Sequence, residues 1–248
     1  MTRYFLKLAY DGTLYHGWQV QENAHSVQAE LEEKLSIMTG QKVQITGCGR
    51  TDTGVHAREF YAHFEIDKLP FKPKDFVYKL NRFLPVDIAI FDLFETAPDA
   101  HARFSAVSRT YKYYINLVKN PFNTKYSYFL SSKPNVEAMN KAAGYLKTYT
   151  DFTSFSKLHT QTATNICKIS EARWDENNKG DLIFTITADR FLRNMVRAVT
   201  GTLLEVGEGK ILPEDIKSII EAKDRSKAGY SVPAKGLFLE KIEYPFLK

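Results

Sequence analysis

The residues with the clearest potential for chemistry lie in one glycine-rich loop, residues 47–56. Its three glycines permit positive φ angles and a close approach of the backbone to another group. Arg50 and Asp52 stand two positions apart between two expected strands, where a rigid scaffold can present a cation beside a carboxylate. An isolated Asp in such a loop more commonly caps its own backbone in a turn, so the loop alone leaves both interpretations open.

Two familiar kinds of site do not fit this loop. It lacks the third glycine and the following helix of a dinucleotide fingerprint, and it has no Lys-Ser or Lys-Thr of a Walker motif. The six histidines and two cysteines show no zinc spacing, and His63-Phe64-Glu65 matches only the first half of a zinc deaminase signature. We therefore expect no metal.

A second signal is a stretch without acidic residues. Between Ala100 and Val136 there is no Asp or Glu, while cations and aromatic rings alternate. Cations that follow phosphates and rings on which bases stack indicate a nucleic-acid surface. The alternative is that the tyrosines form the core of a sheet and the lysines a solvated face. The residues concerned are Arg103, Phe104, Arg109, Tyr111, Lys112, Tyr113, Tyr114, Lys119, Phe122, Lys125, Tyr126, Tyr128, Phe129 and Lys133.

A third signal is an arginine near an apolar helix face. The spacing over 191–206 predicts a helix in which Arg193 and Arg197 share one face beside an apolar stripe. A partly buried guanidinium there needs a carboxylate partner. A solvated arginine that extends from the helix edge is the common alternative.

The chain must position these residues with a mixture of strands and helices. Period-two and helical spacings alternate irregularly, and hairpins occur, which favours an α+β fold with an antiparallel sheet. Strands are expected at 4–10, 42–48, 58–66, 87–95, 110–118, 165–174, 181–188 and 236–243, and helices at 27–38, 74–83, 135–147, 191–206 and 213–222.

Composition limits the class of protein. A chain of 248 residues with 44% hydrophobic residues has ample length for a core, in one large domain or two small ones. Two cysteines are too few for a secreted disulfide framework. No window resembles a membrane span, and Arg3 and Lys7 interrupt the first apolar run, so we expect a soluble cytoplasmic protein without membrane contact. The net charge of +5 is compatible with a polyanionic partner.

Together these motifs resemble the bacterial tRNA pseudouridine synthase A family, over nearly the whole chain. The run from Gly49 to His56 is the most specific, and Thr53 departs from it, since the family usually has Ala there. The other motifs occur in family order. They are Tyr10-Asp11-Gly12, Gly17-Trp18-Gln19, Asn81, Leu84-Pro85, Ala102-Arg103-Phe104-Ser105, Arg109-x-Tyr111-x-Tyr113, Asp151-Phe152-Thr153-Ser154-Phe155, Met195-Val196-Arg197 and Pro233-Ala234-x-Gly236-Leu237.

The resemblance implies an isomerase that converts uridine to pseudouridine at positions 38, 39 and 40 in the anticodon stem-loop of tRNA, without a cofactor. It implies that Asp52 is the catalytic nucleophile and that Arg197 pairs with it. Attack on the sugar, attack on the uracil and a glycal-like route with Asp52 as base all stay open. Arg50 would support base flipping, and Tyr111 would stack on the extruded base.

The family's fold is implied as well. We expect two ferredoxin-like or RRM-like subdomains, 1–105 and 106–248, whose antiparallel sheets join around a central active-site cleft. The resemblance also implies a homodimer. Two alternatives are a non-catalytic RRM-type protein that binds RNA through Tyr111 and Tyr113, and a glycosylase that releases the base.

Overall fold

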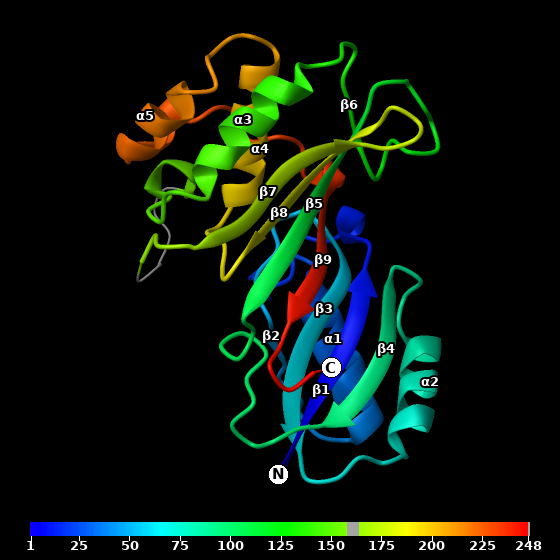
Figure 1. Ribbon diagram of the computed structural model, residues 1–248. Coiled ribbons are helices and arrows are strands. Elements are labelled where there is room, and N and C mark those ends of the chain that lie inside the picture. Colours follow the sequence, from blue (N-terminus) through cyan, green and yellow to red (C-terminus); the bar gives the residue numbers. More distant parts are fainter. Residues whose placement is uncertain (158–163, 248) are drawn as a thin grey trace. The chain divides into compact units, whose positions relative to one another are not determined.

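The computed structural model describes residues 1–157 and 164–247, which fall into two compact units. The first unit comprises Met1–Val107 together with Leu239–Lys248, and the second comprises Ser108–Phe238. Both chain termini therefore belong to the first unit (Figure 1). The subdomain division 1–105 and 106–248 stays a prediction, because a cluster of contacts is not by itself a folding domain.

The first unit is built on three neighbouring strands in the order β4-β1-β3, and β2 pairs with β3. All of these pairs are antiparallel. Helix α1 begins at the predicted N-cap Ser26, whose hydroxyl accepts the Ala29 N–H, and ends at Gly40 with a left-handed φ of 69°. Helix α2 contacts β4 and α1. The elements are β1 (Thr2–Tyr10), a 3-10 turn (Gly12–Leu14), α1 (Val27–Thr39), β2 (Thr46–Gly47), β3 (His56–Ile66), α2 (Pro73–Phe83) and β4 (Ile88–Glu95).

The second unit contains neighbouring strands in the order β5-β8-β7, both pairs antiparallel, with the short β6 parallel to β5. Helix α3 contacts β7, α4 and α5. The elements are β5 (Ser108–Asn116), β6 (Tyr128–Phe129), α3 (Val136–Leu146), β7 (Ile169–Glu176), β8 (Leu182–Ala188), α4 (Met195–Gly207), α5 (Asp215–Glu221) and 3-10 turns at Thr153–Phe155, Arg225–Lys227 and Ala234–Gly236. The last strand, β9 (Leu237–Glu243), begins in this unit and continues in the first.

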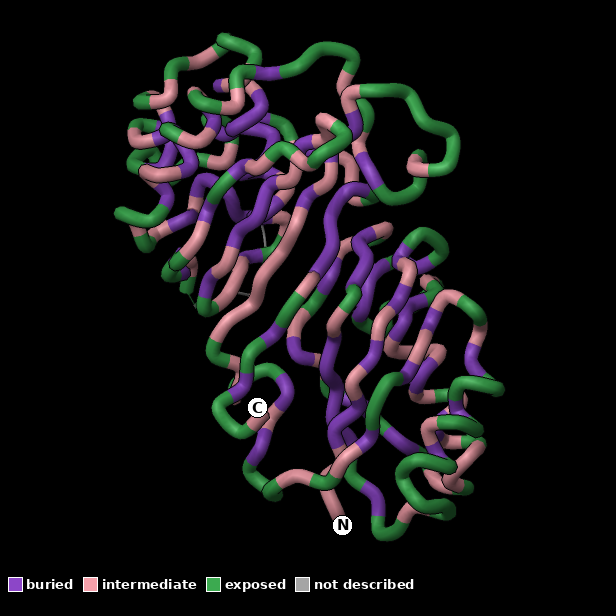
Figure 2. Tube along the Cα trace, turned by 45° about the vertical axis from the view of Figure 1, so that its right-hand side comes forward, coloured by how far each residue is buried: buried purple, intermediate pink, exposed green. Residues whose placement is uncertain are grey.

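The predicted α+β class is confirmed by five α-helices and mostly antiparallel pairing within the described residues. In each unit the buried residues follow the strands and the helix faces turned toward them (Figure 2). Three boundaries differ from expectation by four residues, and the others by at most two. Helix α4 starts at Met195 instead of residue 191, because Asn194 takes a left-handed φ of 66°. The strand expected at 42–48 is reduced to Thr46–Gly47, and the strand expected from 165 begins at Ile169.

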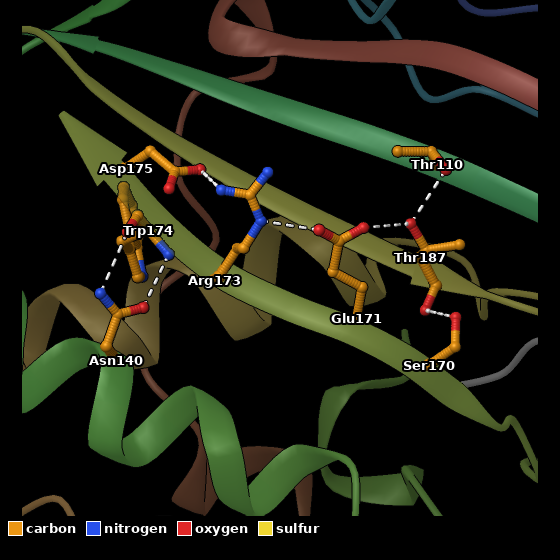
Figure 3. A network of polar contacts seen from close by, with 8 residues as sticks. All are labelled: Thr110, Asn140, Ser170, Glu171, Arg173, Trp174, Asp175 and Thr187. Carbon is orange, nitrogen blue, oxygen red and sulfur yellow. Dashed lines mark hydrogen bonds and ion pairs between the residues drawn. The ribbon is translucent and has the colours of Figure 1, made fainter. Parts of the chain in front are cut away.

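Side-chain amides brace the two strands that end the strand order, β4 and β7. Asn81 of α2 donates to the Ile90 carbonyl at 2.7 Å and accepts the Ile90 N–H at 2.8 Å. Asn140 of α3 does the same to Trp174, at 3.0 Å and 2.8 Å (Figure 3). These bonds satisfy backbone groups on the edge of each strand that faces no other described strand. Asn81 is thus a structural residue of the first unit.

Side chains of alternating charge stand at every second position of β7 and so share one face of the strand. Arg173 forms ion pairs with Glu171 and Asp175, two positions away on either side (Figure 3). All three side chains are well exposed, so these pairs contribute little to the free energy of unfolding. Charges on a terminal strand discourage pairing with another chain, which is the physical role that this row can fill.

The segment 100–105 is tied to the sheet of the first unit through a buried histidine. The Ala102 N–H donates to Nδ1 of His63 at 3.1 Å, and Tyr244 donates its hydroxyl to the Ala102 carbonyl. The His101 ring lies edge-on to His63, with centroids 4.8 Å apart. Burial, together with the His101 and Arg3 charges, lowers the pKa of His63 from 6.5 to about 4. His63 is therefore neutral and accepts a hydrogen bond at neutral pH.

We expect this histidine to make the protein acid-sensitive. Between pH 6.5 and 4 the unfolded chain binds a proton at His63 that the folded protein does not, so stability falls as the pH drops through this window. A pKa change from 6.5 to about 4 corresponds to about 3 kcal/mol in the free energy of unfolding. Chemical denaturation at several pH values measures it.

His63→Asn is the matched control, because its amide oxygen still accepts the Ala102 N–H but carries no titratable ring. The variant should lose less stability than the wild type between pH 7 and pH 4.5. Equal losses in both proteins would contradict the role given to His63.

Candidate active site

The loop of residues 47–56 connects β2 to β3 and is fixed at both ends. The Cys48 N–H donates to the Tyr61 carbonyl at 2.8 Å. A turn follows, in which the Val55 N–H donates to the Asp52 carbonyl at 3.1 Å and Gly54 takes a φ of 76°. The positive φ explains why a glycine stands at position 54. The expected turn at Asp52 is therefore present in the backbone.

Two glycines outside the loop let a second segment approach it closely. A Cβ at Gly17 would lie 2.3 Å from the Thr51 carbonyl oxygen, and a Cβ at Gly12 would lie 2.0 Å from that of Val55. The Trp18 N–H also donates to the Thr51 carbonyl at 3.3 Å, and the Tyr10 and Thr51 hydroxyls are 2.9 Å apart. Only glycine fits at both approach points, so residues 10–18 hold the loop on either side of Asp52.

Gly17→Ala should test this support. The new methyl group meets the Thr51 carbonyl, so the loop must shift, and a shift of about 1 Å at a reacting group can cost about 100-fold in rate. We expect kcat of a reaction that depends on Asp52 to fall at least about tenfold. Gly40→Ala is the control, because Gly40 also has a positive φ, 69°, but has nothing within 4 Å of its Cβ position. Equal activity in the two variants would contradict the supporting role.

The histidine of the loop, His56, is a core residue. His56 is 1% exposed, and its Nδ1 lies 3.1 Å from the Gly12 nitrogen and 3.0 Å from Oδ1 of Asp11. Asp11 also accepts the Thr13 N–H, which caps the 3-10 turn after β1. The Tyr-Asp-Gly motif at residues 10–12 thus serves the same loop.

Three polar side chains of the loop are at least partly exposed. Thr51 and Val55 are buried, at 9% and 2% exposure, while Asp52 is partly exposed and Arg50 exposed. Thr53, the departure from the family pattern, is exposed as well. A backbone locked on both sides thus holds a carboxylate and a guanidinium where a ligand can reach them.

In the second unit, Tyr111 lies on β5 opposite Ile186 and is partly buried. Its ring meets Phe191 edge-on at 5.2 Å. Tyr113, two positions along β5, is fully buried and donates its hydroxyl to the Pro233 carbonyl at 2.8 Å. The RRM-type alternative needs both rings on an open strand face, and a buried Tyr113 contradicts it.

Arg197 lies in the first turn of α4 and is partly buried. Its Nε donates to the Val232 carbonyl at 2.7 Å, and the Val232 N–H donates to the Arg197 carbonyl at 3.2 Å. The helix therefore holds the 228–233 segment. Arg193 lies before the helix and is exposed.

No sequence pattern indicated the set of polar residues that holds residues 228–233. Arg225 donates to the Ala228 and Gly229 carbonyls and, at 3.0 Å, to Oγ of Ser231. Asn194 donates to the same hydroxyl at 2.6 Å. Single polar residues carry no periodic signal, so only the structure could bring them together.

Asp52 and Arg50 thus lie in the first unit, and Tyr111 and Arg197 in the second. The pairing of Asp52 with Arg197 stays a prediction.

A family model described as tRNA pseudouridine synthase matches residues 8–105 and 142–245 of this chain. The chain belongs to the tRNA pseudouridine synthase family. The matched ranges include the 47–56 loop with Arg50 and Asp52, and Arg197 at the start of α4. Tyr111 lies between them, in a stretch that the family model does not match.

Curated relatives agree with this assignment. The tRNA pseudouridine synthase A of Bacteroides fragilis is 52% identical over 243 residues, covering 98% of this chain and 96% of the relative. That of Bacteroides thetaiotaomicron is 52% identical over 247 residues, covering 99% and 91%. That of Bacillus subtilis is 42% identical over 242 residues, covering 96% and 97%. As a member of the tRNA pseudouridine synthase family, the protein is an isomerase that converts uridine to pseudouridine.

A membrane-spanning helix and a cluster of metal-binding side chains are both absent from the described residues. No helix within residues 1–157 and 164–247 is long and apolar enough to cross a lipid bilayer. The same residues contain no group of three or more His, Cys, Asp or Glu side chains that is arranged to hold a metal ion.

Proposed function

We propose that this synthase modifies uridines 38, 39 and 40 in the anticodon stem-loop of tRNA, with Asp52 as its catalytic residue. The observation that carries the assignment of Asp52 is its place in the 47–56 loop. The backbone on both sides of Asp52 is held by close contacts with Gly12 and Gly17, while the side chain stays partly exposed. A preorganised and reachable carboxylate is what nucleophilic or general-base chemistry requires.

The reaction rearranges bonds within one nucleoside. The N1–C1′ bond of uridine breaks, the uracil turns, and a C5–C1′ bond forms. The C5 hydrogen leaves as a proton, and N1 gains a proton. No electrons are exchanged with another molecule, so the proposed reaction requires no redox cofactor. Asp52 takes part either as a nucleophile or as a base at the sugar.

Three further residues have proposed roles. A target base in a helical stem must be extruded, which costs a few kcal/mol of pairing and stacking. The exposed Arg50 supports the flipped-out state, and the partly buried Tyr111 stacks on the extruded base. Arg197, held by the Val232 carbonyl, pairs with Asp52.

We further propose that two ferredoxin-like subdomains join their sheets around a central active-site cleft. Element order supports the subdomains, because β1-α1-β2-β3-α2-β4 and β5-α3-β7-β8-α4-β9 both follow the βαββαβ pattern once short β6 and α5 are set aside. The subdomain bounds proposed remain 1–105 and 106–248. We also propose that the protein is a homodimer and that it acts on tRNA in the cytoplasm. Sedimentation equilibrium of the purified protein tests the oligomeric state.

The position assignment can be tested with three tRNA transcripts, each keeping one uridine among positions 38, 39 and 40. Incubation with the purified protein, followed by chemical mapping of pseudouridine, should detect product in all three. A transcript with none of the three uridines is the control. Product elsewhere in that control, or none in any transcript, would contradict the proposed target.

A further inference from the structure

The acid-free stretch that first indicated a nucleic-acid surface is divided by the structure into core and surface. Tyr113 is fully buried, whereas Phe122 is 89% exposed. Phe122 lies in the connection of residues 117–127 between β5 and β6, here called the β5–β6 loop. This loop falls outside the ranges that the family model matches. The catalytic roles proposed above do not use it.

The β5–β6 loop is ordered by its own hydrogen bonds. Asn120 accepts the Phe122 N–H with its side chain at 3.0 Å and the Asn123 N–H with its carbonyl at 3.2 Å. At the end of the loop, Ser127 donates to the Asn123 carbonyl at 2.9 Å. A ring that an ordered loop holds in solvent is accessible for stacking on a partner.

The charge around this ring favours an anionic partner. Lys119 and Lys125 are exposed on either side of Phe122, and neither forms an ion pair with another described residue. The whole stretch from Ala100 to Val136 contains no acidic residue. A ring between two cations matches an unpaired base between two phosphates.

We propose that the β5–β6 loop is a second RNA contact, in which Phe122 stacks on an unpaired base of the bound tRNA while Lys119 and Lys125 contact the adjoining phosphates. This contact rests on the proposed substrate, because it takes the tRNA as the partner. It is separate from the target nucleotide. The loop begins after Asn116, the last residue of β5, which lies five residues and about 16 Å beyond Tyr111 at the rise of a strand.

The test compares tRNA affinity and turnover across three substitutions at one position. Phe122→Ala should weaken binding of an unmodified tRNA transcript about tenfold, with the loss in Kd and KM rather than in kcat. Phe122→Trp should keep the affinity, because it still stacks. Phe122→Leu should bind as weakly as Phe122→Ala, because it is apolar without a ring face.

Phe91→Ala is the matched control. Phe91 is another exposed phenylalanine, 56% exposed on β4, but its sequence neighbour is Asp92 and it lies outside the acid-free stretch in sequence. Its substitution should leave tRNA affinity unchanged. The double variant Lys119→Ala/Lys125→Ala should lower the salt dependence of log Kd by about 0.7 per lysine. Phe122→Ala should leave that slope unchanged.

Four results would overturn the proposal. These are wild-type affinity in Phe122→Ala, full affinity in Phe122→Leu, an unchanged salt slope in the lysine variant, and a changed oligomeric state in Phe122→Ala, which would show that a second copy of the chain covers the ring. Failure of the proposed function looks different. A wild-type protein that binds tRNA through Phe122 but forms no pseudouridine would retain the RNA contact and remove the synthase assignment.

Discussion

Asp52→Asn is expected to bind tRNA with nearly wild-type affinity and to form no detectable pseudouridine. The substitution keeps the size of the side chain and leaves the loop contacts of Thr51 and Val55 in place. It removes the carboxylate that serves as nucleophile or base, and losses on removal of such a group reach about 10⁴-fold or more. Single-turnover modification and filter binding, measured on the same tRNA, separate the two effects.

Thr53→Ala is the matched control for this variant. Thr53 is exposed on the same loop, and alanine is the residue that the family usually has there. Turnover should stay within about threefold of the wild type, because no bond to the reacting group is removed. Clear residual pseudouridine in Asp52→Asn would remove Asp52 from its role, as would an equal loss in both variants.

Arg197→Leu is expected to lower kcat by about 100-fold or more, because the proposed partner of the Asp52 carboxylate is lost. The same change removes the donor to the Val232 carbonyl, which should cost about 2 kcal/mol in the free energy of unfolding.

Asn140→Ala separates these two consequences. Asn140 makes two hydrogen bonds to Trp174 in the same unit, so its loss also destabilises the fold without touching the proposed site (Figure 3). Its kcat, measured well below the unfolding temperature, should match the wild type. A wild-type kcat in Arg197→Leu would contradict the pairing with Asp52.

Local sequence patterns predicted most of the helices and strands. Helix α1 follows its predicted cap, apolar spacing and terminal glycine, because each of these acts over a few residues. The predicted start of α4, residue 191, was wrong by four residues, since the left-handed conformation of Asn194 leaves no periodic signal. The short β6 was missed for a similar reason, because two paired residues carry no alternation.

The site was only partly accessible from sequence. The types and spacing of Arg50 and Asp52 suggested chemistry, but a turn explained the same residues, and resemblance to a family decided between the two. The support by Gly12 and Gly17 depends on contacts across 43 and 34 positions of sequence, to Val55 and Thr51, which no local pattern encodes. The exposure of Phe122 and the burial of Tyr113 likewise depend on the folded chain.

Release of tritium from C5 of uridine tests the central claim most directly. Purified protein is incubated with tRNA that carries tritium at C5 of its uridines, without added metal or cofactor. Formation of the C5–C1′ bond expels that hydrogen, so we predict release of tritium into water by the wild type and none by Asp52→Asn. Tight tRNA binding without release, or release of free uracil as a glycosylase would produce, would contradict the account.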